Sequence, residues 1–182
     1  MSRLDRATAL LFVVDVQEKL MPAIDDRETV IANLERIIRG SLILGLPVLV
    51  TEQYVKGLGR TIEPVRAALG EAYRPIEKNC FSATGCADFE SKLRQSGRKQ
   101  ILVCGVETHV CVYQTASDLL RGGYEVTLIA DALSSRTREN KLVALERMQR
   151  DGAKLSSTEM ALFELMHVAG TEEFKAVSKL IK

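Results

Sequence analysis

The chain has 182 residues, with 25 basic and 24 acidic side chains, a net charge of +1 and 46% hydrophobic residues. This length and composition predict one domain, spanning residues 1–182, with a single core. The charges are interspersed and form no dense Lys or Arg stripe, which argues against a nucleic-acid partner. The early apolar run at 9–14 is too short to span a bilayer. We therefore expect a cytoplasmic protein without a membrane contact.

Strand-like and helix-like segments alternate along the chain. Continuous apolar runs that end in a polar or small residue predict buried parallel strands at 9–14, 46–51, 100–105 and 124–130. Shorter strands are expected near 75–76 and 153–155. Helical periodicity predicts helices at 27–44, 86–96, 110–121 and 138–150, and two more within 158–182 that divide near Gly170. Residues 52–73 lack clear periodicity and are expected to form a loop.

This alternation predicts an α/β fold in which helices cover both faces of a mostly parallel sheet. Ligands of such sheets bind outside the carboxyl ends of the strands, so the residues that follow the strands are the candidates for a site. They are Asp15, Glu52, Gln53, Tyr54, Lys78, Phe81, residues 107–111 and Asp131.

Two common kinds of site are disfavoured by the residues present. Neither GxGxxG nor GxxxxGK[ST] follows a predicted strand, and the GxG at 57–59 is more simply a turn, which argues against a Rossmann dehydrogenase. Residues 52–54 offer a carboxylate, an amide and a phenol but no histidine, so we expect no catalytic metal and no cofactor.

The cysteines point to another chemistry. Cys80, Cys86, Cys104 and Cys111 show no CxxC spacing, and a chain of this size needs no disulfides, so we expect free thiols. Cys111 follows a strand at the start of a predicted helix. The helix dipole and a nearby cation would lower its pKa and favour the thiolate. A small buried hydrophobe is the alternative interpretation for Cys111 and the favoured one for the other three cysteines.

A nucleophilic cysteine needs a base, and the two histidines fit this role poorly. His109 lies two residues from Cys111 on a helix and should face away from it, and His167 fits better as a packing residue. Asp15 at a buried strand end is therefore the candidate base, with Lys78 as the nearby cation. The alternative interpretations are a turn residue for Asp15 and a solvated lysine for Lys78.

The order of these residues resembles the Asp, Lys and Cys motifs of the isochorismatase-like cysteine hydrolase superfamily. The resemblance spans most of the chain and rests on Asp15 after its strand, on EKNCFS at 77–82 and on GVETHVC at 105–111. TEQY at 51–54 with GLG at 57–59, and ADALSSR at 130–136, narrow it to the isochorismatase domain-containing and YcaC-like proteins.

The resemblance implies a three-layer α/β/α fold with a six-stranded sheet, assembled as a homo-oligomer. It implies that Cys111 attacks a carbonyl carbon, that Asp15 accepts and returns a proton, and that Lys78 balances their charge. It also implies a cis peptide bond between Val106 and Glu107, and an oxyanion hole made of the backbone N–H groups of Glu107 and Cys111.

We expect a small-molecule substrate. This chain differs from two groups of the superfamily, and both differences narrow the class of substrate. Members that cleave isochorismate lack the cysteine, so Cys111 favours hydrolysis of a small amide through a thioester. Nicotinamidases carry metal-binding Asp and His residues where this chain has residues 52–54, which disfavours nicotinamide. An apolar pocket for a small planar substrate would be lined by Gln53, Tyr54, Leu58 and Phe81. The alternatives are a catalytically silent interaction protein and a thiol sensor on the same fold.

Overall fold

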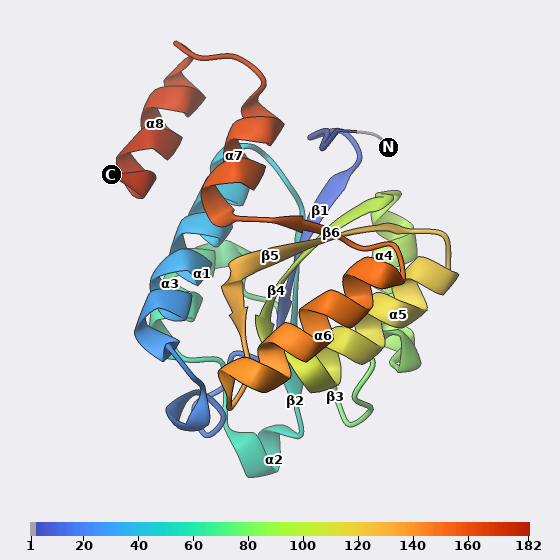
Figure 1. The fold of residues 1–182 in the computed structure, drawn as a ribbon. Coiled ribbons are helices and arrows are strands. Elements are labelled where there is room, and N and C mark those ends of the chain that lie inside the picture. The colour runs from blue at the N-terminus through green and yellow to red at the C-terminus, as the bar shows by residue number, and fades with distance from the viewer. Residues whose placement is uncertain (1–2) are drawn as a thin grey trace.

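Six parallel strands form the centre of the computed structural model, which describes residues 3–182 (Figure 1). Their order across the sheet is β3-β2-β1-β4-β5-β6. The strands are β1 (Ala9–Val14), β2 (Val48–Gln53), β3 (Ile76–Lys78), β4 (Gln100–Val106), β5 (Glu125–Ser134) and β6 (Lys154–Ser156). The predicted α/β class and six-stranded sheet are confirmed.

Helices cover both faces of this sheet. They are α1 (Arg27–Ile43), α2 (Val55–Leu58), α3 (Glu63–Leu69), α4 (Ala87–Ser96), α5 (Tyr113–Arg121), α6 (Arg138–Arg150), α7 (Thr158–Met166) and α8 (Glu172–Ile181). In Figure 1, α1, α3, α7 and α8 lie on one side of the sheet, and α4, α5 and α6 lie on the other. None of the helices within residues 3–182 is long and apolar enough to cross a membrane.

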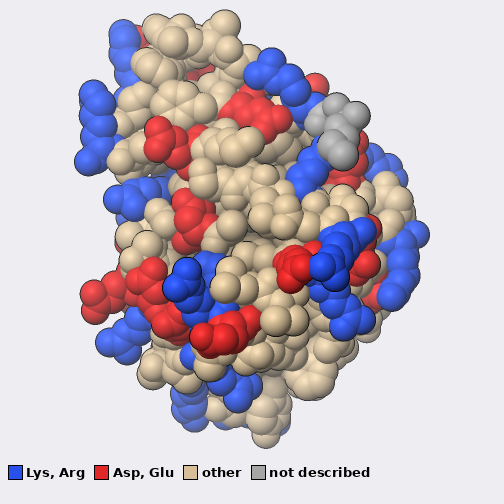
Figure 2. Space-filling model, viewed as in Figure 1, with Lys and Arg blue, Asp and Glu red and all other residues tan. Residues whose placement is uncertain are grey.

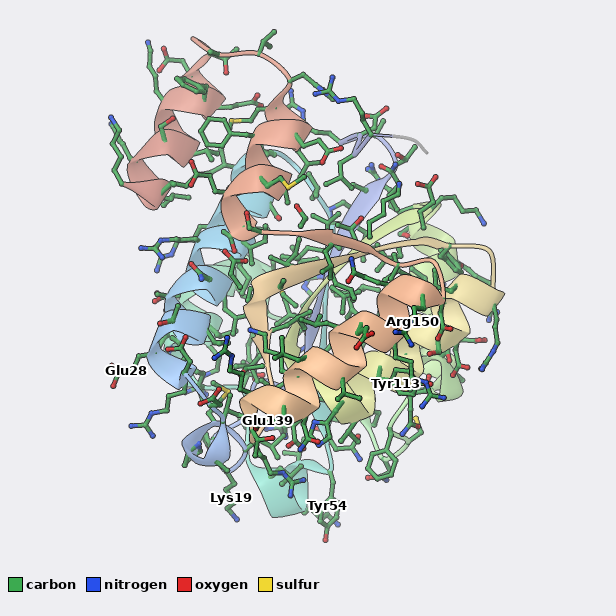
Figure 3. All side chains as sticks on the ribbon, in the orientation of Figure 1. Lys19, Glu28, Tyr54, Tyr113, Glu139 and Arg150 are labelled. Carbon is green, nitrogen blue, oxygen red and sulfur yellow. The ribbon has the colours of Figure 1, made fainter. Side chains whose placement is uncertain are left out.

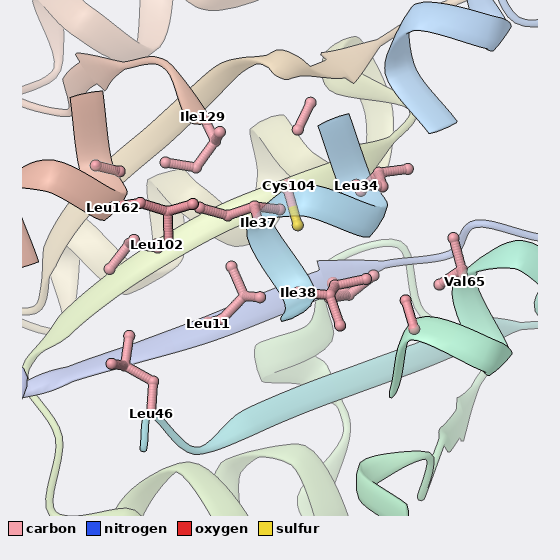
Figure 4. Packing of buried hydrophobic residues seen from close by; sticks show 14 of the residues in the cluster. Leu11, Leu34, Ile37, Ile38, Leu46, Val65, Leu102, Cys104, Ile129 and Leu162 are labelled. Carbon is pink, nitrogen blue, oxygen red and sulfur yellow. The ribbon is translucent and has the colours of Figure 1, made fainter. Parts of the chain in front are cut away.

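The two layers explain why β1 is apolar along its whole length. Leu11 and Val13 pack into the cluster beneath α1 and α7, which Figure 4 shows from close by. Leu10, Phe12 and Val14 point to the opposite face and pack against α4 and α5. A strand that is buried on both faces has no position for a polar residue until it ends. The first polar side chain after β1 is therefore Asp15, at the carboxyl edge of the sheet.

Strand β1 lies between β2 and β4, and β4 reaches it through a glycine. Gly105 pairs with Val14 and has a φ of +110°. A Cβ atom at Gly105 would lie 2.2 Å from the Val14 carbonyl oxygen, so only glycine fits. This close approach brings Asp15 beside residues 107–111. The sheet order reverses direction between β1 and β4, which is where open α/β sheets bind their ligands.

Three expectations about the elements need correction. Residues 52–73 are mostly ordered secondary structure, with the end of β2, helices α2 and α3 and a short 3₁₀ turn. The helix predicted at 110–121 begins two residues earlier, with a π-helical turn at Thr108–Val112. Strand β5 extends to Ser134, so Asp131 lies within it and not after it; its carboxylate accepts hydrogen bonds from Thr158.

Candidate active site

Asp15 and Lys78 form a buried ion pair at the carboxyl edge of the sheet. Lys78 Nζ lies 2.8 Å from Asp15 Oδ2, and their side chains are 0% and 1% exposed. The second carboxylate oxygen, Oδ1, accepts a hydrogen bond from Thr51 Oγ1 at 2.7 Å. Asp15 has a φ of +48°, a left-handed conformation that aspartate tolerates better than most residues. The carboxylate is thus fixed in place by its backbone and two partners.

The ammonium group of Lys78 has further acceptors around it. It donates to Gln53 Oε1 at 2.7 Å and approaches the carbonyl oxygens of Cys80 and Phe81 at 3.2 Å each. Gln53 pairs with Lys78 in the register of β2 and β3, which explains why their side chains meet. A buried ammonium is stable only when its donors and its charge have partners. Lys78 meets both conditions, so it can remain charged.

Cys111 lies beside this ion pair, and its pKa is opposite to the expectation. The residue is 7% exposed, and its thiol interacts with both Asp15 and Lys78. Burial and, secondly, the neighbouring Asp15 carboxylate raise the pKa of Cys111 to about 12, against the smaller lowering effect of Lys78. The predicted thiolate at neutral pH is therefore wrong. A protonated thiol beside a carboxylate needs that carboxylate to take its proton when it attacks.

This pKa changes which cysteine should react first with an alkylating reagent. Cys80 and Cys86 are half-buried, whereas Cys111 is buried. At neutral pH, iodoacetamide should therefore label Cys80 and Cys86 before Cys111. At pH values above the pKa of an ordinary thiol, the alkylation rate of Cys111 should still rise about tenfold per pH unit, because only the thiolate reacts. Peptide mapping across a pH series measures this. A Cys111 rate that levels off below pH 9 would contradict the raised pKa.

The turn that carries Cys111 is tied to the end of β5. Glu107 binds Arg136 through two hydrogen bonds, of 2.7 Å to Nε and 3.2 Å to Nη2. Thr108 Oγ1 donates to the Ser134 carbonyl oxygen at 2.8 Å. The Val106–Glu107 peptide bond is cis.

Neither histidine takes the place of a base for Cys111. His109 Nδ1 lies 3.0 Å from Ser135 Oγ, and the charged groups that act on the Cys111 thiol are Asp15 and Lys78. His167 follows α7 and is exposed, so the packing role expected for it is wrong.

The residues predicted to line the pocket have different positions. The Gln53 amide accepts a hydrogen bond from Lys78 Nζ and donates to the Asn79 carbonyl oxygen, so it belongs to the framework of the ion pair. A substrate contact of Gln53 remains a prediction. Tyr54 is 56% exposed and points away from the sheet (Figure 3). Phe81 is exposed, and Leu58 is half-buried with its carbonyl oxygen bound to the Lys19 N–H. Substrate contacts of Tyr54, Leu58 and Phe81 remain predictions.

A cavity of about 520 Å³ adjoins the ion pair. Its lining consists of Tyr54, Val55, Lys56, Glu77, Lys78, Asn79, Cys80, Gly85 and Cys86. Asp15 and Cys111 are not part of this lining. The cavity therefore borders the site on the Lys78 side and does not reach the thiol.

Two buried polar residues complete the framework: Gln17, which sequence reasoning missed, and Glu52, which it gave only as a residue that follows a strand. Gln17 Nε2 donates to the carbonyl oxygens of Gln53 and Gly59, and its Oε1 accepts the Gln53 N–H. Glu52 accepts hydrogen bonds from Tyr73, Thr61 and Arg60. Burial tends to raise the pKa of Glu52, but these donors outweigh it and hold the pKa below its ordinary value. A polar residue within three positions of a buried strand end is the signal that could have found Gln17.

No three His, Cys, Asp or Glu side chains within residues 3–182 gather as a metal-ion ligand set. The Glu52 carboxylate, the nearest candidate on β2, is occupied by its three partner residues. On the face shown in Figure 2, basic and acidic side chains alternate without a large area of one sign.

The chain is thus an α/β protein with a parallel sheet. An aspartate, a lysine and a cysteine meet at the carboxyl edge of this sheet. Residues 8–160 match the family model described as the isochorismatase domain. The chain belongs to the isochorismatase family. This confirms the resemblance inferred from the motifs.

Relatives and a solved structure agree with this assignment. The chain is 40% identical over 186 residues to the secreted isochorismatase effector Isc1 of Phytophthora sojae (strain P6497), covering 100% of this chain and 88% of the relative. It is 37% identical over 175 residues to isochorismatase domain-containing protein 2A of Mus musculus, covering 96% and 83%. The structure of MAR1 ribonuclease from Caenorhabditis elegans superposes with a TM-score of 0.91 at 36% identity, covering 99% and 92%.

Proposed function

We propose that this chain is a metal-independent cysteine hydrolase that cleaves the C–N bond of a small amide through a thioester on Cys111. The observation that carries this proposal is the buried Asp15–Lys78 ion pair with the Cys111 thiol beside it. A buried ion pair contributes little to stability compared with apolar residues of the same volume. Its position beside a buried thiol is therefore better explained by chemistry.

The first half-reaction forms the acyl-enzyme. Cys111 Sγ attacks the amide carbonyl carbon while the Asp15 carboxylate takes the thiol proton, and Lys78 remains charged beside it. The carbonyl electron pair moves to oxygen, where the N–H groups of Glu107 and Cys111 would bind the oxyanion. When the oxyanion collapses, the C–N bond breaks and the nitrogen receives the proton from Asp15. Ammonia or an amine leaves.

The second half-reaction regenerates the enzyme. A water molecule gives a proton to Asp15 as its oxygen attacks the thioester carbon. Collapse of this second intermediate breaks the C–S bond, releases a carboxylic acid and returns the proton to sulfur. The sum is amide plus water giving acid plus amine. A protonated thiol at rest suits this cycle, because Asp15 is then free as a carboxylate to accept the proton.

The structure weighs against a thiol sensor. Sensor cysteines are accessible and have a low pKa, because their reactions with oxidants require the thiolate. Cys111 is buried, and its pKa is raised to about 12. The same burial makes an extended polymer a poor substrate, although the relative from Caenorhabditis elegans is described as a ribonuclease. An RNA oligonucleotide therefore belongs in the test as a competing substrate.

The test is ammonia release from a panel of small amides that includes nicotinamide, with an RNA oligonucleotide assayed in parallel. We expect turnover of at least one amide by the native chain and none by Cys111→Ala. Cys104→Ala is the matched control, because Cys104 is also a buried thiol whose pKa is raised by burial. It should retain activity. Turnover by Cys111→Ala, or cleavage of RNA without cleavage of any amide, would overturn the proposal.

Two further properties complete the proposal. A homo-oligomer is expected from the family resemblance, and light scattering would measure its size. Cytoplasmic location is likewise a prediction, and the relative from Phytophthora sojae is described as secreted.

A further inference from the structure

Glu107 begins the turn that carries Cys111, and its oxygen atoms are held from two directions. Its carbonyl oxygen accepts hydrogen bonds from the backbone N–H groups of Val110 at 3.1 Å and Val112 at 3.3 Å. Its carboxylate binds Arg136 Nε and Nη2. The carbonyl contacts hold the Glu107–Thr108 peptide group, and the Arg136 contacts hold the Glu107 side chain. The Glu107 N–H belongs to the preceding peptide group, which shares the Cα atom of Glu107, so both sets of contacts limit the rotation that would turn this N–H.

The Arg136 side of this arrangement rests on a fixed support. Ser134, two residues before Arg136, is held at the end of β5, where Ser134 Oγ donates to the Asp25 carbonyl oxygen at 2.7 Å. Asp25 in turn donates its N–H to the Ser135 carbonyl oxygen at 2.9 Å. Arg136 thus extends from an anchored segment across to Glu107.

Exposure differs sharply between the two partners. The Glu107 side chain is 8% exposed, whereas that of Arg136 is 62% exposed. A carboxylate that is nearly out of water is costly unless a counter-charge and hydrogen bonds compensate it. Without Arg136, the Glu107 carboxylate would turn toward water and move its own peptide group. Loss of the exposed arginine would leave no buried cavity, so the fold should persist.

We propose that Arg136 is a positioning residue of this site, which acts by holding Glu107 so that the Glu107 N–H stays directed at the developing oxyanion. The inference rests on the proposed function, because it assigns the Glu107 N–H to an oxyanion hole. Arg136 itself is paired with the Glu107 carboxylate and is not assigned a contact with a reacting atom. It acts on the reaction only through the Glu107 peptide group.

The test uses a neutral aliphatic aldehyde, butanal, as a probe. Cys111 Sγ adds to the aldehyde carbon and forms a C–S bond, the electron pair of the C=O π bond moves to oxygen, and the Asp15 carboxylate takes the thiol proton, which leaves an oxyanion. The resulting thiohemiacetal places its oxygen in the oxyanion hole. Alkylation of Cys111 by iodoacetamide displaces iodide and forms no oxyanion. Protection of Cys111 from alkylation by increasing butanal therefore gives the aldehyde affinity, and the rate without butanal gives the thiol reactivity.

We expect Arg136→Ala to weaken butanal binding at least about tenfold, because loss of one oxyanion donor costs about 10²–10³ in rate. The alkylation rate without butanal should stay unchanged. Guanidinium ion at a non-denaturing concentration should restore part of the affinity. Arg150→Ala is the matched control, since Arg150 is another exposed arginine paired with a glutamate, Glu146, on α6. It should match the native chain.

Three outcomes would count against the inference. Equal butanal affinity in Arg136→Ala and the native chain would overturn it while leaving the proposed function intact. A parallel loss of alkylation rate and butanal affinity would show a general structural role and would overturn it as well. Butanal that fails to protect Cys111 of the native chain would instead overturn the proposed function, and the inference with it.

Discussion

Asp15→Asn should lower kcat for the amide substrate by about 10²–10⁴, the usual contribution of general acid–base catalysis. The asparagine keeps the shape of the side chain but cannot take the proton of the Cys111 thiol when the sulfur attacks. KM should change much less, because the loss falls on the transition state. Steady-state kinetics with the substrate found in the amide panel would measure both constants.

The control for this variant is Asp151→Asn. Asp151 is exposed at the end of α6, so the same chemical change there should leave both constants unchanged. Thermal unfolding should accompany the kinetics to show that Asp15→Asn is folded at the assay temperature. A kcat within assay error of the native value would remove Asp15 from the mechanism.

Lys78→Met should abolish turnover and lower the free energy of unfolding by about 3–5 kcal/mol, the usual cost of breaking a buried ion pair. Methionine has nearly the volume of lysine, so the loss reports charge and not a cavity. The Asp15 carboxylate would remain buried with Thr51 Oγ1 as its hydrogen-bond donor and without a counter-charge. Urea unfolding at neutral pH measures the change.

A double variant separates electrostatics from packing. In Asp15→Asn with Lys78→Met, neither side chain carries a charge, so the double variant should be more stable than the sum of the two single losses predicts. It should still be inactive, because the base is missing. If the two single losses simply add, the charges of Asp15 and Lys78 are not coupled, and the geometry described here would not account for their effects.

Local patterns in the sequence were sufficient for most of the fold. The apolar run at 9–14 corresponds to β1 because a strand covered on both faces must be apolar at every position. Helices α2 and α3 were missed because they are short and depend on distant contacts. Gln17 binds the Gly59 carbonyl oxygen, and Glu52 binds Thr61. Neither contact has a local sequence signal.

The candidate site was predictable in composition but not in its electrostatics. Asp15, Lys78 and Cys111 each follow a strand, and parallel strands bring such residues to one edge. The degree of burial could not be read from the sequence, and burial is what raises the pKa of Cys111. The role of Gln53 likewise depends on the pairing of β2 with β3, and that of Arg136 on the place where β5 ends beside Glu107.

The most direct test of the thioester mechanism is the mass of the Cys111 peptide during turnover. The reaction with the amide identified by the panel is quenched in acid within the first turnovers, and the four cysteine peptides are mapped. The mechanism predicts that Cys111 carries the acyl part of the substrate, without its amine, and that Cys80, Cys86 and Cys104 are unmodified. Turnover that proceeds with the Cys111 peptide unmodified at every time point, or with the acyl group on another cysteine, would contradict it.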